Sequence, residues 1–171
     1  MVNRTSPPAA RASSSAPGGG ILAIDYGRAR IGLALASSSA GLAQPLATLE
    51  RVNRNEDMRR LRGLVRDHGV RFVVVGLPLR LDGTRGEMAE EAERFAGRVR
   101  KQIGVPVQMV DERLTSWQAE REMEEQFGRR SRAGESASKN KTGERVSVDS
   151  MAAAIILREY LAQRKTEDAA E

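Results

Sequence analysis

Apolar residues fall into short runs at the start of the chain and into helical stripes further on. Two apolar runs, 21–25 and 31–36, flank a short turn that contains Gly27. This pattern is typical of a buried strand, a tight reversal and an antiparallel partner strand. Segment 45–50 begins with Pro45. We predict a third strand there, with the character of an edge strand, because proline is tolerated at the start of such a strand.

Two further strands are predicted later, at 71–75 and 105–110. The first is a β-branched run, which is typical of a strand buried on both faces. Helical spacing of apolar residues predicts helices over 53–69, 84–103, 115–127 and from about Ser147 to Leu161. An early antiparallel meander followed by alternating strands and helices implies an α/β fold, in which helices cover the faces of a mixed sheet.

The ends of two of these helices have recognisable signals. Asn53 is followed three residues later by Glu56, which resembles a capping box. Thr84 and Glu87 have the same spacing before the second helix, and Gly104 suits its end. His68 falls in the last turn of the first helix, where we expect it to interact with the negative end of the helix dipole rather than to act in catalysis.

Three stretches lack apolar periodicity. Residues 1–20 are rich in Ser, Ala, Pro and Gly and are predicted to be a disordered arm. Residues 164–171 are predicted to be a flexible, polar C-terminal tail. The polar loop 128–145 has an excess of basic residues, so it could contact a nucleic-acid backbone, although a solvated surface loop explains it equally well. The single domain is therefore expected to span 21–163.

Composition excludes several kinds of site. The chain of 171 residues has no cysteine, so disulfides, thiolate metal sites and cysteine nucleophiles are ruled out. His68 is the only histidine, which rules out a histidine-rich metal site. The net charge of +5 and the pI of about 10.2 favour a polyanionic partner. No apolar run approaches the roughly 18 residues that would span a bilayer, so no membrane association is expected.

Acidic residues stand at the ends of several predicted elements. Asp25 ends the first strand, Asp111 and Glu112 end the strand 105–110, and Asp149 falls in the first turn of the apolar last helix. Ligands of open α/β sheets bind at the carboxyl ends of parallel strands, so these acids are expected to gather there. Carboxylates that are brought together repel one another, and a hard divalent cation relieves that repulsion.

Two cations about 4 Å apart can promote phosphodiester cleavage without any histidine. Each acid also has a structural interpretation when it is considered alone. Asp25 could cap its turn, and Asp149 could favour the helix dipole. Arg113 could contact phosphate or form an ion pair with the neighbouring acids, and the sequence does not separate these two roles.

Four blocks of residues resemble the YqgF (RuvX) family of Holliday-junction-resolvase-like proteins, which are also regarded as nucleases that mature precursor 16S ribosomal RNA. The blocks stand in the family's order and cover about residues 21–162. They are Ala23-Ile-Asp25-Tyr-Gly27 with Arg30-Ile-Gly32, Val74-Val-Gly76-Leu-Pro78-Leu with Asp82-Gly83-Thr84, Asp111-Glu112-Arg113-Leu-Thr115, and Val148-Asp149-Ser-Met-Ala-Ala-Ala-Ile-Ile-Leu157.

The resemblance implies a ribonuclease H-like fold and phosphodiester cleavage that depends on Mg²⁺ or Mn²⁺. It implies that Asp25, Glu112 and Asp149 are catalytic and hold the metal. Glu112 is favoured within its block, but the strand pattern leaves Asp111 open as a metal ligand. The expected substrate-binding residues are Arg113, Lys139, Lys141 and Arg145. The glycines Gly27 and Gly76 are expected to let the backbone approach metal or phosphate.

The function predicted from these observations is a metal-dependent endonuclease that processes the 5′ end of precursor 16S ribosomal RNA in the cytoplasm, as a monomer or a homodimer. Two alternatives remain: a Holliday junction resolvase that acts on branched DNA, and a non-catalytic RNA-binding factor in ribosome assembly. The turn around Asp25 also resembles the phosphate-binding hairpin of sugar kinases. Those enzymes usually need two such domains, so a phosphotransferase ranks lower.

Overall fold

The computed structural model describes residues 19–37, 41–115, 121, 125 and 146–170. A five-stranded mixed sheet with the order β3-β2-β1-β4-β5 forms its centre. β1 pairs antiparallel with β2, which pairs antiparallel with β3, whereas β1, β4 and β5 run parallel. The strands are β1 (Gly20–Tyr26), β2 (Arg30–Ala36), β3 (Gln44–Glu50), β4 (Val70–Leu77) and β5 (Val107–Asp111). The meander and the mixed sheet predicted from the sequence are both confirmed.

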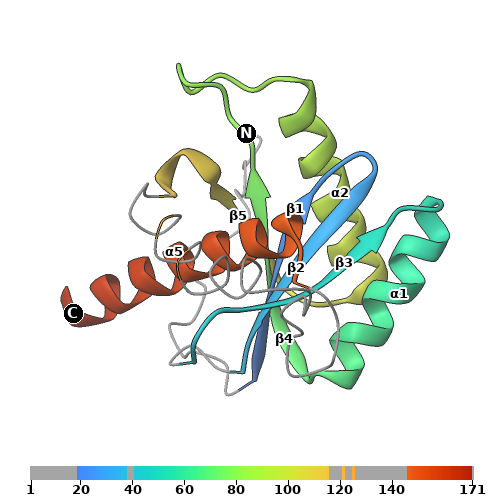
Figure 1. Cartoon of the computed structure of the whole chain (residues 1–171), viewed down its shortest axis with the longest axis horizontal. Helices are drawn as coiled ribbons and strands as arrows, with labels where there is room; N and C mark the ends of the chain where they lie inside the picture. Colours follow the sequence, from blue (N-terminus) through green and yellow to red (C-terminus); the bar gives the residue numbers. More distant parts are fainter. Residues whose placement is uncertain (1–18, 38–40, 116–120, 122–124, 126–145, 171) are drawn as a thin grey trace, which may run out of the picture.

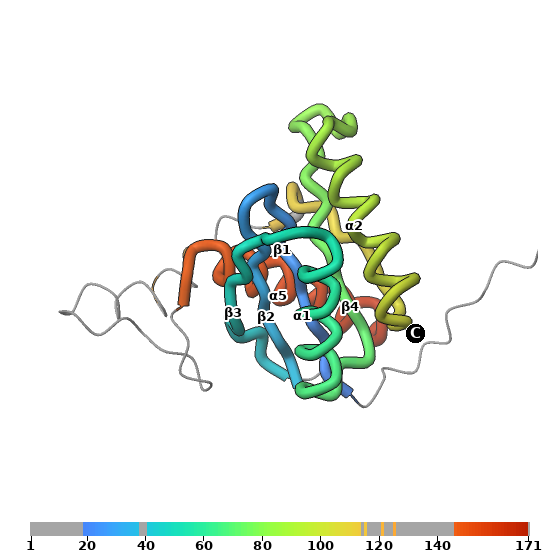
Figure 2. The backbone as a smooth tube through the Cα atoms, turned by 90° about the vertical axis from the view of Figure 1, so that its right-hand side faces the viewer, coloured from blue at the N-terminus to red at the C-terminus, as the bar shows by residue number. Residues whose placement is uncertain are grey.

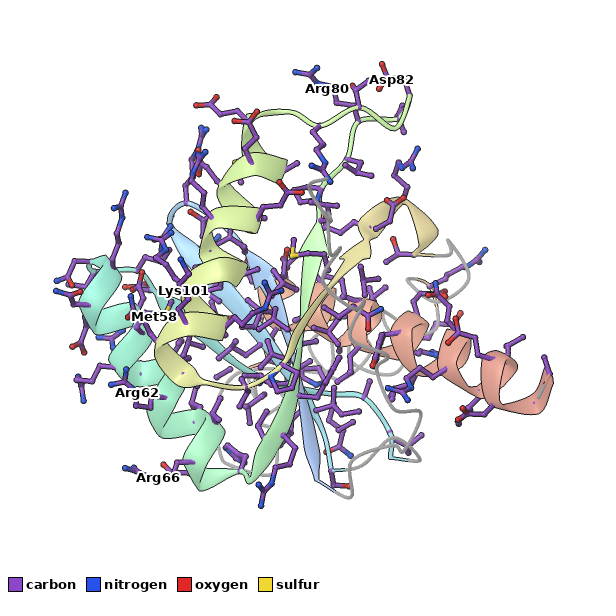
Figure 3. The ribbon with its side chains drawn as sticks, turned by 180° about the vertical axis from the view of Figure 1, so that it is seen from behind. Met58, Arg62, Arg66, Arg80, Asp82 and Lys101 are labelled. Carbon is purple, nitrogen blue, oxygen red and sulfur yellow. The ribbon has the colours of Figure 1, made fainter. Side chains whose placement is uncertain are left out.

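In the part of the chain that the structure describes, three helices cover the two faces of this sheet. α1 (Arg54–Asp67) and α2 (Glu87–Ile103) lie side by side on one face, where the Arg62 side chain donates to the Gln102 carbonyl, and α5 (Val148–Ala170) crosses the other face (Figures 1 and 2). A short 3₁₀ helix, η1 (Glu112–Leu114), follows β5 directly. Seen from behind, α1 and α2 stand in front of the sheet and α5 lies behind it (Figure 3).

Alternation along β1 decides which side chains face which helices. Leu22, Ile24 and Tyr26 pack into the core under α1 and α2, whereas Ile21 and Ala23 pack against α5. Side chains two residues apart share a face of a strand. Asp25 therefore belongs to the α5 face, at the carboxyl end of the strand.

The helix signals in the sequence are confirmed in part. Asn53 caps α1 by accepting a hydrogen bond from the Glu56 amide at 3.0 Å. Gly104 ends α2 in the left-handed conformation with φ 79°. The prediction that Thr84 caps α2 is wrong, because the N-cap is Gly86 and the Thr84 hydroxyl donates to Asp82 Oδ1 instead.

The last helix continues further than the sequence predicted. Residues 164–170 were expected to be a frayed tail, but α5 is helical to Ala170. Residues after Leu161 are mostly good helix formers without glycine or proline, so the helix has no reason to stop there.

The predicted arm falls outside the described residues up to residue 18, and Gly20 already belongs to β1. The predicted helix 115–127 and the loop 128–145 also lie almost wholly outside the described residues. No helix within the described ranges is apolar over a length that would cross a membrane.

Candidate functional site

The acids predicted to form a site come from three different elements that meet at one end of the sheet. Asp25 is the next-to-last residue of β1, Glu112 follows β5 directly, and Asp149 is in the first turn of α5. β1 and β5 both run parallel to β4, so their carboxyl ends point to the same edge. The helix α5 brings Asp149 to that edge from the outer face.

Asp25 is largely buried, and no cationic side chain pairs with it among the residues that the structure describes. Its pKa is raised to about 6, first by burial and then by the negative charge of Asp149. An ionised carboxylate that leaves water without a partner is costly, so this group holds a proton more tightly than an ordinary aspartic acid.

Glu112 is in a similar position. Its pKa is raised to about 7, first by burial and then by the negative charges of Asp25 and Asp111. Gly76 in β4 makes the room for this side chain, because a Cβ atom there would collide with Glu112 Oε1 and with Ile156 Cδ1 of α5. The missing side chain of Gly76 therefore leaves room for a carboxylate beside Asp25, and the expected approach of its backbone to metal or phosphate stays a prediction.

Asp111 differs from its neighbour because it is held by a cation. The Arg113 Nη2 atom lies 2.7 Å from Asp111 Oδ2, and the Arg113 amide and Nε donate to the same carboxylate. These contacts hold the pKa of Asp111 below its usual range. In this structure Glu112 is therefore the acid of the pair that couples to Asp25, while Asp111 positions Arg113. The ion-pair interpretation of Arg113 agrees with the observed contacts.

Asp149 reaches the edge because α5 comes very close to β2. Gly32, which pairs with Asp25 across the ladder, has no side chain to block the backbone of Asp149, and a Cβ atom at this position would collide with the Asp149 carbonyl. Ser147 and Ser150 cap the start of α5 reciprocally: each amide donates to the other side chain's hydroxyl.

Arg30 at the start of β2 forms an ion pair with Asp149. Its Nε lies 3.0 Å from Asp149 Oδ2, at the rim of the site. Sequence reasoning quoted Arg30 and Gly32 as part of a motif but assigned neither a role. The antiparallel pairing of the two predicted strands could have identified Gly32, because it places this glycine opposite Asp25. A residue without a side chain at that position leaves space for another backbone to come close.

The donor set suits a hard divalent cation in its chemistry, because every candidate ligand is a carboxylate oxygen. Two of the acids have raised pKa values that a bound cation would lower. No three acidic or imidazole groups within the described ranges lie close enough together to form a finished metal cluster. Asp149 is paired with Arg30 instead.

Two other predictions have different outcomes. A Cβ atom at Gly27 would collide with the Arg30 carbonyl of its own hairpin, so the turn needs glycine there, and the expected approach of its backbone to metal or phosphate stays a prediction. Lys139, Lys141 and Arg145 lie outside the described residues, and their expected contact with substrate stays a prediction.

Comparison with known sequences agrees with this arrangement. The family described as "RuvX: Holliday junction resolvase" matches residues 19–163. The chain belongs to the RuvX family. This confirms the resemblance that the four sequence blocks indicated, and the match covers every element of the sheet together with Asp25, Glu112 and Asp149.

RuvX relatives align over most of their length. A protein of Koribacter versatilis named "Putative pre-16S rRNA nuclease" is 40% identical over 150 residues, which are 88% of this chain and 91% of the relative. A protein of Azotobacter vinelandii with the same name is 39% identical over 84% of this chain and 94% of its own.

Solved structures support the fold. Thermus thermophilus RuvC has a TM-score of 0.54 at 16% identity, covering 86% of this chain and 96% of its own. The same protein in complex with a Holliday junction substrate has a TM-score of 0.53 at 19% identity, covering 85% and 96%. At such low identity, the likeness concerns the fold alone. It confirms the predicted ribonuclease H-like class.

Proposed function

We propose that this RuvX protein is a nuclease that hydrolyses phosphodiester bonds in structured RNA and that it processes precursor 16S ribosomal RNA. The observation that carries the proposal is the juxtaposition of Asp25 and Glu112, two largely buried carboxylates with raised pKa values and no cationic partner among the described residues. Stability does not call for such a pair, whereas cleavage assisted by a divalent cation does. The names of the relatives point to the same substrate.

Within this proposal, Asp25, Glu112 and Asp149 hold Mg²⁺ or Mn²⁺. When bound, the cation supplies positive charge against the negative charge that develops on the phosphodiester. Asp111 contributes indirectly, because its contacts with Arg113 orient a guanidinium beside the site. The pKa of Glu112, at about 7, allows this group to exchange a proton near neutral pH before a cation binds. We propose the cytoplasm as the location, because precursor ribosomal RNA is the proposed substrate.

A branched DNA substrate is the second candidate. The family's description as a Holliday junction resolvase and the fold shared with the RuvC junction complex favour it. Two symmetric cuts in a junction need two sites, so this alternative requires a homodimer, whereas RNA cleavage is compatible with a monomer.

The test compares the wild type with Asp25→Asn and Asp149→Asn on a precursor 16S RNA fragment and on a four-way DNA junction, each with Mg²⁺, Mn²⁺ or chelator. We expect metal-dependent RNA cleavage that both variants lose. Arg28→Gln is the matched control, since Arg28 lies in the same hairpin but pairs with Glu87 and Glu91 on the other face. Cleavage of the junction alone would favour the resolvase. Tight RNA binding without cleavage in either metal would contradict a nuclease and favour an assembly factor.

A further inference from the structure

A tight turn after β4 stands next to the carboxylates and has no part in the chemistry proposed so far. This turn, residues 80–84, is called the Leu81 turn here. The Gly83 amide donates to the Arg80 carbonyl at 2.8 Å, and the Arg80 amide donates to the Thr84 carbonyl at 3.0 Å. Gly83 has φ +84°, which favours glycine. The Thr84 amide and hydroxyl both donate to Asp82 Oδ1. Hydrogen bonds of the backbone and of the Asp82 side chain therefore hold the turn in one conformation.

The Leu81 turn is also attached to the site. Arg113, held by Asp111, places its guanidinium against Gly83, and its Nη1 lies 3.5 Å from the Leu81 carbonyl. Hydrogen bonds from Thr84, and more weakly the charge of Arg113, lower the pKa of Asp82. Because Arg113 follows Glu112 in the chain, the turn has a defined position relative to the buried carboxylates.

The tip of this rigid turn presents an unusual pair of side chains to solvent. Leu81 is 98% exposed, more than any other large apolar residue that the structure describes. Arg80 is exposed as well and has no acidic partner within those residues, whereas Arg85 close by is paired with Glu93. Figure 3 shows the labelled Arg80 and Asp82 projecting beyond the start of α2, away from the sheet. An apolar side chain fixed in full contact with water stabilises nothing in the free protein.

We infer that the Leu81 turn is a nucleic-acid-reading element: Leu81 packs into a base step that is open at a helix end or junction, while Arg80 contacts the adjacent phosphate. This inference rests on the proposed nuclease function and names the structural feature of its substrate. Apolar wedges are used in this way by proteins that unstack bases, and arginine contacts to phosphate fix the register. The rigidity of the turn lowers the entropy that would be lost when the wedge is inserted.

The experiment measures binding with Ca²⁺ in place of Mg²⁺, to favour binding over cleavage. The probe is an RNA hairpin with a single-stranded 5′ extension and 2-aminopurine at the helix end. We expect the wild type to raise 2-aminopurine fluorescence as the base unstacks. Leu81→Ser should abolish that rise and weaken binding on the order of tenfold, the scale expected for one buried Leu side chain. Arg80→Gln should keep the rise and reduce the salt dependence of binding by about one phosphate contact.

Leu42→Ser is the matched control. Leu42 is 81% exposed in the connection between β2 and β3, at the opposite end of the sheet. It should bind and unstack the probe like the wild type. An unchanged fluorescence rise in Leu81→Ser, or equal losses in Leu81→Ser and Leu42→Ser, would overturn the inference and leave the nuclease function standing. If the wild type binds no RNA at all, the proposed function fails first and the inference fails with it.

Discussion

Two buried acids near the same edge of the sheet have opposite surroundings. Asp57 in α1 is 2% exposed and is fully partnered: Arg51 Nε lies 2.9 Å from Oδ2, and the Val52 amide donates to Oδ1. The same Arg51 also donates to the hydroxyl of Tyr26, the residue after Asp25. Asp25 itself, on the other face of β1, has a second acid as its charged neighbour instead of a cation.

The difference separates a structural acid from a functional one. The fold supplies Asp57 with a guanidinium and an amide, so its charge is compensated inside the protein. In the described part of the chain, Asp25 and Glu112 have no such compensation: burial raises both pKa values, and the negative charges of Asp149 on Asp25 and of Asp25 on Glu112 add to the effect. Such an arrangement lowers stability and persists at sites where an external ligand compensates the charge.

Asp57→Ala should cause the largest loss of stability. Removing one partner of a buried ion pair leaves Arg51 uncompensated, which costs about 3–5 kcal/mol. Urea unfolding at pH 7.5 measures this loss. The double variant Asp57→Ala with Arg51→Met is the control, and it should recover part of the loss because it removes both charges. A loss below about 1 kcal/mol in the single variant would show that the pair is not structural.

Asp25→Asn should raise the free energy of unfolding instead of lowering it. The folded protein holds the Asp25 proton up to about pH 6, whereas the unfolded chain loses it near 3.8. Stability therefore falls as pH rises between these values, by about 3 kcal/mol at most for a shift of this size. Without cations, the variant should match the wild type below pH 4 and be the more stable protein above pH 6.

Thermal unfolding with chelator at pH 4, 5, 6 and 7.5 measures this difference. The difference in melting temperature between the variant and the wild type should grow through this pH range. Added Mg²⁺ should stabilise only the wild type. A difference in melting temperature that is the same at all four pH values would contradict a raised pKa for Asp25.

Gly76→Ala should disturb the site without removing an acid. The added methyl group would displace Glu112 Oε1 and Ile156 Cδ1, and such overpacking costs about 1–3 kcal/mol. Affinity for Mn²⁺, measured by calorimetry, should fall as well. Gly63→Ala in α1 is the control, since a methyl group there meets open space and should stabilise the helix by about 0.5–1 kcal/mol. Equal effects of the two changes would show that Gly76 does not seat Glu112.

The sequence predicted the sheet, the first two helices and the positions of the acids, because these depend on local periodicity and on residues at element ends. It could not decide between Asp111 and Glu112. That choice depends on the 3₁₀ turn after β5, where Arg113 folds back onto Asp111 and leaves Glu112 to the buried side. The role of Gly76 was also hidden, since its neighbour Glu112 belongs to the 3₁₀ helix after β5, more than 30 residues later. The role of Gly76 depends on a long-range contact, and the choice between the two acids depends on a short turn that apolar periodicity does not encode.

Arg30→Gln should have the smallest effect on stability and a clear effect on cation binding. The Arg30–Asp149 pair is half open to solvent, with the two side chains 59% and 29% exposed, so its loss should cost under about 1 kcal/mol. The same guanidinium competes with a divalent cation for Asp149. Its removal should therefore tighten Mn²⁺ binding roughly fivefold at low salt, and less at high salt, where the competition is screened. Arg28→Gln, measured by the same calorimetry, should leave the affinity unchanged. Weaker Mn²⁺ binding in Arg30→Gln would mean that Arg30 positions Asp149 for the cation, so that a cationic partner would not by itself mark an acid as structural.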